Sequence, residues 1–144
     1  MKLSIKSISN VGAVRKANED YLFDGARFIR DDKHEYELDV VAEDTKILFA
    51  VADGMGGHNA GELASEILLK ELVNSFSIFV REYPDADSAD LKVFFSDEIK
   101  RIHQYLVDEG KRNPEKSGMG STFVGLLLYK GRFFAINAGD SRLY

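Results

Sequence analysis

The stretch that most constrains the fold is a short apolar run, residues 47–52, that stops at a carboxylate. Asp53 follows this run directly, and three glycines come within the next four positions before a helical pattern begins. An apolar run this short is typical of a buried strand rather than a helix. Anionic oxygen beside bare glycine backbone suits a hard metal ion or a phosphate. The stretch therefore predicts either a ligand-binding corner built on Asp53 or an ordinary strand-to-helix turn.

Composition excludes several classes of function. The chain has 144 residues, no cysteine and a net charge of -5. Its length allows one domain with a core, and the lack of cysteine excludes disulfides, zinc–thiolate sites and a thiol nucleophile. The negative charge argues against a nucleic-acid partner. Because no apolar run is long enough to span a membrane and the first residues do not look like a signal peptide, we expect a cytoplasmic protein with no membrane partner.

Hydrophobic periodicity predicts five strands and two helices. A capping box is expected at Asn59 and Glu62, where the first helix begins, and new cap candidates lie in 85–88 before the second. The strands are expected at 1–9, 21–23, 46–52, 121–129 and 132–138, and the helices at 59–83 and 88–110. Two consecutive helices between strands that can pair through short turns indicate an α+β fold with antiparallel sheet.

Two expectations concern how these elements are covered. Residues 26–45 are rich in both acidic and basic side chains, so we interpret them as a loop or a solvated hairpin. The strands at 121–129 and 132–138 are nearly continuous in apolar residues. We therefore expect both faces of their sheet to be covered.

Polar residues gather at four expected corners of the fold. Taken singly each is weak, because a Gly-Asp-Ser-Arg sequence is usually a turn and an Arg four residues before a Glu is usually an ion pair. The four are Arg15-Lys16-Ala17-Asn18-Glu19-Asp20, Asp53-Gly54-Met55-Gly56-Gly57-His58, Gly118-Met119-Gly120-Ser121-Thr122 and Gly139-Asp140-Ser141-Arg142. Their order and spacing carry more information than any one of them.

Together these corners closely resemble the protein phosphatase 2C family in its bacterial form. The resemblance extends over essentially the whole chain apart from 26–45. It implies a sandwich of antiparallel sheets flanked by helices, and a metal-dependent phosphatase acting on phosphoserine and phosphothreonine in proteins. It also implies two Mn²⁺ or Mg²⁺ ions that activate a water for direct attack on phosphorus. Such a mechanism needs no Ser or Cys nucleophile.

The resemblance implies roles for the acidic positions. Asp53 is similar to the carboxylate that bridges both metal ions, and Gly54 to the residue whose carbonyl binds one of them. Glu19 resembles the acidic residue that holds the second metal directly or through water. Asp20, next to it, is then expected in the outer shell.

Three further residues complete the implied site. Arg15 resembles the phosphate-binding arginine, whose planar guanidinium suits two phosphate oxygens; with Asp53 it forms the expected catalytic pair. Asp140 resembles a ligand of a weaker third-metal site. His58 belongs to the bacterial form of the motif, and we interpret it as a structural or outer-shell residue.

The same resemblance implies that residues 1–144 form a single partial domain. The family pattern continues with a later Asp-Gly block and a later Asp-Asn block, each supplying a metal-binding aspartate, and this chain contains neither. We read it as the N-terminal half of the domain. With few carboxylates to complete two near-octahedral shells, weak or partial metal binding and little or no turnover are expected.

Three functions remain open from the sequence. The first is a phosphatase domain acting on a phosphoprotein. The second is a non-catalytic half-domain that serves as a binding or regulatory module, and the third is a small α+β domain whose acidic corners are only turns. Because the apolar strands near residue 144 would leave an unpaired sheet edge, we also expect a second copy or an exchanged strand to cover it.

Overall fold

Eight strands and two long helices form the fold in the computed structural model, which describes residues 1–57 and 59–144. The larger sheet has the order β3-β2-β5-β7-β8, with β6 paired to β5, and β1 pairs with β4 in a separate two-stranded sheet. All pairs are antiparallel. The strands are β1 Lys2–Ile8, β2 Asp20–Phe23, β3 Phe28–Ile29, β4 Lys33–Asp39, β5 Lys46–Met55, β6 Gly120–Ser121, β7 Phe123–Tyr129 and β8 Arg132–Ala138.

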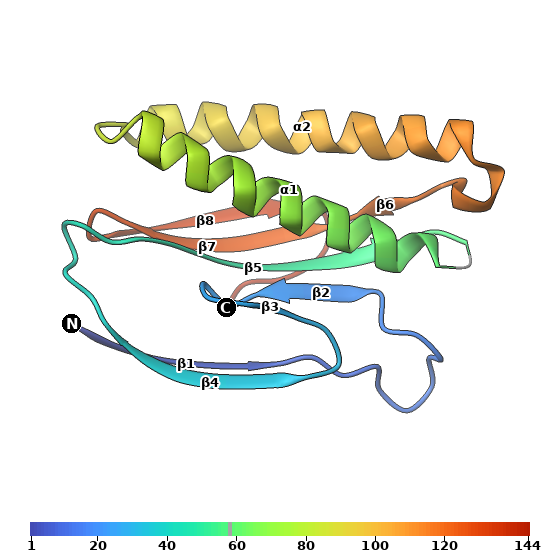
Figure 1. Cartoon of the computed structure of the whole chain (residues 1–144), viewed down its shortest axis with the longest axis horizontal. Helices are drawn as coiled ribbons and strands as arrows, with labels where there is room; N and C mark the ends of the chain where they lie inside the picture. The colour runs from blue at the N-terminus through green and yellow to red at the C-terminus, as the bar shows by residue number, and fades with distance from the viewer. Residues whose placement is uncertain (58) are drawn as a thin grey trace.

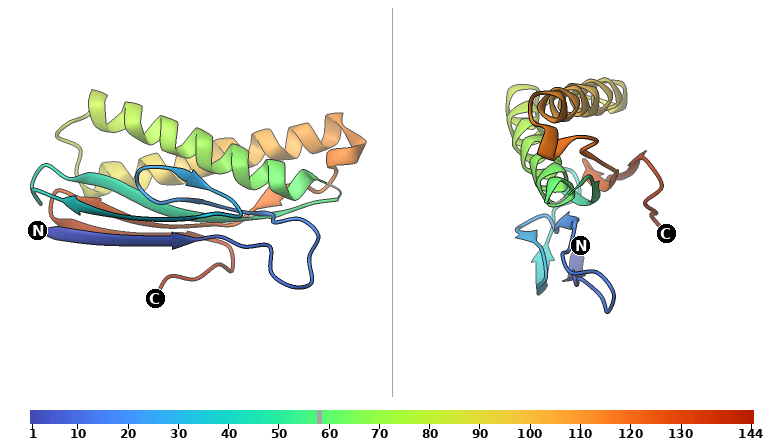
Figure 2. Two further views of the ribbon diagram at one scale, coloured as in Figure 1. Left: turned by 60° about the horizontal axis from the view of Figure 1, so that its bottom comes forward. Right: turned by 90° about the vertical axis from the view of Figure 1, so that its right-hand side faces the viewer.

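The elements form layers. Helices α1 (Ala60–Glu82) and α2 (Ser88–Arg112) cover one face of the larger sheet, and the β1–β4 pair lies on its other side (Figures 1 and 2). The two helices follow one another in the chain, between antiparallel strands. The expected α+β class with a consecutive helix pair is therefore confirmed.

Apolar side chains between the helices and the sheet make the main core. Each fully buried side chain of this kind stabilises the fold by about 1.5–3 kcal/mol. The helices contribute Leu68, Leu69, Leu72, Phe76, Leu91, Phe95, Ile102 and Leu106, and strands β5 and β7 contribute Leu48, Ala50, Ala52, Phe123, Leu127 and Tyr129. The predicted apolar stripe of α1 thus packs on the central strands, and this fixes where α1 begins relative to the end of β5.

The two helix starts differ in capping. Asp87 accepts hydrogen bonds from the Ala89 and Asp90 amides, and the Asp90 side chain accepts one from the Asp87 amide, so α2 has a full capping box. At the start of α1, the Asn59 side chain makes no cap hydrogen bond in the described part of the chain. The predicted box there is wrong, because Asn59 does not adopt the extended backbone that a capping side chain needs (φ -91°, ψ 13°).

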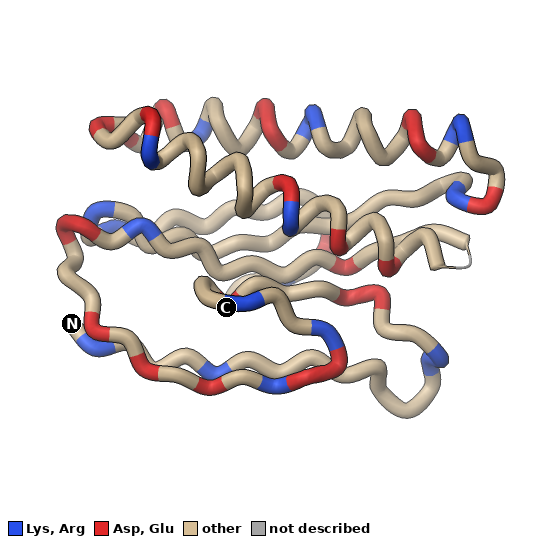
Figure 3. The backbone as a smooth tube through the Cα atoms, in the orientation of Figure 1, with Lys and Arg blue, Asp and Glu red and all other residues tan. Residues whose placement is uncertain are grey.

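The interpretation of residues 26–45 as a loop or a solvated hairpin is wrong. The segment contains two strands, β3 and β4, and β4 pairs along its whole length with β1. His34, Tyr36 and Leu38 face inward between exposed charged neighbours. Across the pair, Lys2 binds Glu37 and Lys6 binds Glu35, which explains the mixed charge along both strands (Figure 3).

The coverage of β7 and β8 differs from the expectation. β7 is buried on both faces, as predicted. β8 alternates instead, because Phe134, Ile136 and Ala138 face the helices while Phe133 stays 60% exposed on the other face. Both sides are apolar in sequence, so periodicity could not tell the covered face from the open one.

Within the described residues, neither helix is apolar enough over its length to span a membrane.

Candidate metal centre

Asp53 lies inside strand β5 rather than after it, because the strand runs to Met55. Its amide donates to Thr122 Oγ1 (3.1 Å), and its carbonyl accepts from the Thr122 amide (2.9 Å). Ser121 Oγ also donates to the same carbonyl, at 3.2 Å. The backbone of Asp53 is therefore fixed by the chain that leads into β7, while its side chain stays exposed.

A second carboxylate stands directly opposite. Strand β2 pairs with β5 so that Asp20 is the cross-strand partner of Asp53. Partial burial, then the Asp53 charge and a hydrogen bond shared with the Asp53 side chain, raise the pKa of Asp20 above its usual value of 3.8. Two like charges in such a pair repel each other when no cation lies between them. The arrangement fits a hard divalent cation, whose charge would relieve this repulsion.

Glu19 is held near this pair by the start of α1. Its carbonyl accepts from the Gly54 amide (3.2 Å) and from the Ser65 hydroxyl (2.6 Å). Its carboxylate lies against Gly61, where an added Cβ would come within 2.2 Å of Oε1. Gly54 is needed for the same close approach, since a Cβ there would come within 1.9 Å of the Gly61 carbonyl oxygen. The two glycines let β5, Glu19 and α1 meet at one point.

Arg15 points at this corner. Its guanidinium binds the Glu19 carboxylate at 3.1 Å, and its side chain is 75% exposed. The loop that carries it is anchored by Asn18, whose side-chain amide donates to Ser9 Oγ and Asp31 Oδ1 while its Oδ1 accepts from the Asp20 amide. An exposed guanidinium beside carboxylates can bind an anion that arrives with a cation.

Asp140 follows β8 at the same edge of the sheet. The neighbouring Ser141 hydroxyl is 2.7 Å from Thr122 Oγ1, the atom that binds the Asp53 amide. Between described residues, however, no hydrogen bond or ion pair joins Asp140 to Asp53. The structure thus brings Arg15, Glu19, Gly54 and Asp20 to Asp53, and leaves Asp140 at the margin. His58 lies outside the described residues.

The donors available here are fewer than a closed metal cage needs. Among residues 1–57 and 59–144, no three His, Cys, Asp or Glu side chains gather into a group that could hold a metal ion. The Asp20–Asp53 pair offers oxygen ligands from one side, and Glu19 is turned toward Arg15 and Gly61. This partial set fits a cation that keeps several of its waters.

Sequence reasoning missed Arg30, which ties β2 to α1. Its guanidinium donates to the carbonyls of Asp20 (3.1 Å) and Glu62 (2.8 Å) and to Ser65 Oγ (2.9 Å), and it stacks over the ring of Tyr21. Arg30 stands in the charged segment 26–45, where nothing local distinguishes it. The small residue Ser65, in the buried stripe of α1, was the one available signal.

A model of the family described as protein phosphatase 2C matches residues 27–144. The chain belongs to the protein phosphatase 2C family. Serine/threonine protein phosphatase PstP of Mycobacterium tuberculosis is 29% identical over 136 residues, which are 94% of this chain and 21% of the relative.

Solved structures of the family have the same fold. A crystal structure of M. tuberculosis PstP/Ppp aligns with TM-score 0.66 and 27% identity over 98% of this chain and 48% of that one. The PstP catalytic domain in complex with two manganese ions aligns with TM-score 0.63 and 26% identity over 99% and 49%. This phosphatase 2C chain therefore spans about half of each solved structure and about a fifth of the M. tuberculosis relative.

Proposed function

We propose that this chain carries part of the active site of a metal-dependent protein serine/threonine phosphatase. The observation that supports this most is the Asp20–Asp53 carboxylate pair, held opposite each other on β2 and β5 with Arg15 beside it. The relatives are named serine/threonine phosphatases, and one was solved with two manganese ions. The substrate is then a protein that carries phosphoserine or phosphothreonine.

Each residue has a proposed task. Asp53 and Asp20 would supply oxygen ligands to Mn²⁺ or Mg²⁺, and the Gly54 carbonyl and Glu19 would be further ligands. A divalent ion bound there would lower the pKa of a bound water and neutralise phosphate charge. Arg15 would release the Glu19 carboxylate and bind two phosphate oxygens instead. It would thereby orient the phosphoryl group above the carboxylates.

Two residues keep proposed supporting roles. Asp140 is a ligand of a weaker additional metal site, for which its place beside Ser141 at the same sheet edge is the support. His58 is proposed as structural or outer-shell, on the sequence motif alone. The position of Asp20 opposite Asp53 also favours a direct ligand role for Asp20, beyond the outer-shell role that the family resemblance implies.

The 144-residue chain by itself is expected to turn over slowly or not at all. Its described residues place no three metal-binding side chains together, which supports weak binding of one ion rather than tight binding of two. The test is hydrolysis of p-nitrophenyl phosphate and of a phosphothreonine peptide with Mn²⁺, comparing the chain with Asp53→Asn. Exposed Asp39→Asn, on the separate β1–β4 sheet, is the matched control.

The outcomes separate the two parts of this proposal. Slow hydrolysis that Asp53→Asn abolishes and Asp39→Asn leaves unchanged supports a phosphatase site. Fast turnover that depends on Asp53 would overturn the expectation that these residues are insufficient. Activity that is the same in both variants would overturn the site itself.

The sparse ligand set favours a second candidate function, a non-catalytic binding or regulatory module. Such a module would bind a phosphopeptide through Arg15 and the metal corner without hydrolysing it. Calorimetric titration with a phosphothreonine peptide in Mn²⁺ distinguishes the two, because binding without phosphate release is expected only for the module. Loss of peptide binding in Arg15→Ala would show that the phosphopeptide binds at the corner that carries Arg15.

We also propose that a second copy or an exchanged strand covers the open face of β8. Support comes from Phe133, 60% exposed on a strand at the edge of the sheet. Light scattering at micromolar concentration is expected to give a mass above that of one chain, and the mass of a single chain would count against the idea.

The cytoplasmic location stays a prediction.

A further inference from the structure

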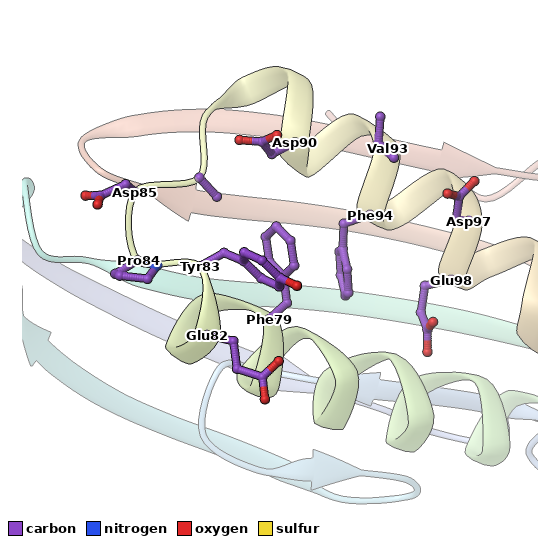
Figure 4. A pocket seen from close by; sticks show the side chains of 11 residues that line it. Phe79, Glu82, Tyr83, Pro84, Asp85, Asp90, Val93, Phe94, Asp97 and Glu98 are labelled. Atoms are coloured by element: carbon purple, nitrogen blue, oxygen red, sulfur yellow. The ribbon is translucent and has the colours of Figure 1, made fainter.

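A hollow lies far from the metal corner, where α1 ends and α2 begins. Its volume is about 740 Å³, and both helices and the turn between them line it (Figure 4). That volume is within the usual range for binding pockets. Helix α1 has 23 residues, so this helix-turn groove is roughly 33 Å from the end of the helix that lies against Gly54 and Glu19.

Aromatic rings form the floor of the helix-turn groove. Phe79 stacks on Phe94 with ring centroids 4.5 Å apart, and Tyr83 packs on Phe79 at 5.3 Å. Tyr83 is 58% exposed and Val93, on the facing turn of α2, is 61% exposed. An apolar surface of this kind, open to solvent, is typical of a place where another molecule packs.

Carboxylates surround this floor. Five of them line the groove, and no Lys, Arg or His side chain does so among the described residues. Asp90 is occupied in capping α2, and Glu98 binds Ser75 and Arg101. The remaining three, Glu82, Asp85 and Asp97, are exposed and have no hydrogen bond or ion pair to any described residue. Three carboxylates are therefore available to an incoming cation.

The groove is held in shape by the sheet below it. The Ala86 amide donates to the Tyr83 carbonyl (3.1 Å), and the Ala86 carbonyl accepts from the buried Tyr129 hydroxyl at 3.1 Å. Lys130 approaches the same carbonyl at 3.5 Å, from the sheet side. The turn is thus fixed before any partner arrives, which lowers the entropic cost of binding.

We propose that the helix-turn groove docks a basic segment of a partner protein, in which arginine or lysine flanks one bulky apolar side chain. The apolar side chain packs on Phe79, Tyr83 and Phe94. The flanking cations pair with the three available carboxylates and lie over the exposed ring of Tyr83. This surface is independent of the metal corner and of the proposed phosphatase activity.

The chain contains no tryptophan, so emission from a tryptophan in a peptide reports on the peptide alone. The probe is a nine-residue peptide with two arginines on each side of a central tryptophan. We expect its emission to shift to shorter wavelength as the 144-residue chain is added, because the indole enters an apolar site. Combined Glu82→Gln, Asp85→Asn and Asp97→Asn is expected to weaken this binding roughly tenfold.

A control variant carries the same change in charge elsewhere. It combines Asp39→Asn, Glu43→Gln and Glu115→Gln, three exposed positions outside the groove, and is expected to bind within about twofold of the unmodified chain. Tyr83→Ser is expected to abolish the emission shift. Equal weakening in both triple variants would reduce the effect to net charge and overturn the proposal. Spermine that displaces the peptide at equal concentration would also overturn it, in favour of a small polyamine.

Discussion

At the scale of single residues, two glycines decide how closely β5, Glu19 and α1 approach. A Cβ on Gly54 would collide with the Gly61 backbone carbonyl, whereas the nearest atoms to a Cβ on Gly61 all belong to the flexible Glu19 side chain. Backbone cannot yield without moving an element, but a carboxylate can rotate away. The same substitution should therefore have different consequences at the two positions.

We expect Gly54→Ala to lower the free energy of unfolding by about 1–3 kcal/mol, as overpacking does. Gly61→Ala should leave it nearly unchanged, because the helix propensity gained with alanine, up to about 1 kcal/mol, offsets the displaced Glu19. Urea unfolding of both variants provides the measurement. Equal destabilisation would show that Glu19 is as rigid as backbone at this point.

Asp24 is a buried carboxylate that the proposed chemistry does not use. Burial opposes its ionisation, but hydrogen bonds from the Arg27 and Ala26 amides and from His34 outweigh this and hold its pKa below 3.8. A folded-state pKa below the unfolded value stabilises the protein above the unfolded pKa, and this contribution is lost as pH falls through the folded pKa. Asp24 therefore stabilises the fold near neutral pH.

Asp24→Asn is expected to cost about 1–3 kcal/mol at pH 5, because the charged acceptor is lost. Below about pH 4 the difference from the unmodified chain should shrink, because the carboxyl takes up a proton first in the unfolded state and, at lower pH, in the native state as well. Thermal unfolding between pH 5 and pH 2.5 measures this, with exposed Asp39→Asn as the control. A difference that stays constant over the whole range would mean that the charge of Asp24 contributes nothing.

At the scale of elements, Arg30 connects β2 to α1 by hydrogen bonds. One guanidinium reaches two carbonyls and a buried hydroxyl, on elements separated by more than 30 residues in the chain. Its partners at Asp20 and Ser65 are the same groups that place the acidic corner. Rigid support from one element to the next keeps catalytic or ligand-binding side chains in place.

Arg30→Lys is expected to destabilise the chain by about 2–3 kcal/mol, because an ammonium cannot reproduce the planar set of donors. Exposed Arg27→Lys serves as the control and should change stability by less than about 0.5 kcal/mol. Urea unfolding compares the two. Similar values for both would mean that the three hydrogen bonds of Arg30 add nothing beyond its charge.

The sequence predicted the helices and most strands better than it predicted which strands pair with one another. The central strand and both helices follow from periodicity, because their apolar stripes are long and uninterrupted. Strand β4 was missed because its inward residues, His34, Tyr36 and Leu38, are only half-buried and alternate with charges. Its pairing with β1 depends on contacts about 30 residues apart, which local composition does not encode.

In the candidate site too, sequence motifs identified some residues, whereas the roles of others depend on strand pairing and contacts between distant elements. The family resemblance implied that Arg15, Glu19 and Asp53, which stand in two separate motifs, belong to one site, and the structure brings the strands and loop that carry them together. The opposition of Asp20 to Asp53 required the register of β2 against β5, since a shift of one residue would turn Asp20 to the other face of the sheet. Arg30 needed three contacts from distant elements before its role became visible.

At the scale of the whole molecule, the carboxylate pair that we propose as a metal site is expected to lower the stability of the metal-free chain. Asp20 and Asp53 repel each other across two central strands, and the repulsion is part of what raises the pKa of Asp20. In the metal-free chain no cation relieves this repulsion. Asp20→Asn is therefore expected to stabilise the metal-free chain by about 0.2–1 kcal/mol, and a bound cation should reverse the order of the two proteins.

Thermal unfolding in EDTA and in millimolar Mn²⁺ tests this reversal. In EDTA the unmodified chain should melt below Asp20→Asn. In Mn²⁺ it should gain stability as ligand binding predicts, by about 1.4 kcal/mol for each tenfold excess over the dissociation constant, while Asp20→Asn gains less. Exposed Glu43→Gln removes one negative charge far from the pair in sequence and should keep the Mn²⁺ response intact. A Mn²⁺ response that Asp20→Asn retains in full would remove Asp20 from the metal-binding set and leave its repulsion of Asp53 without a function.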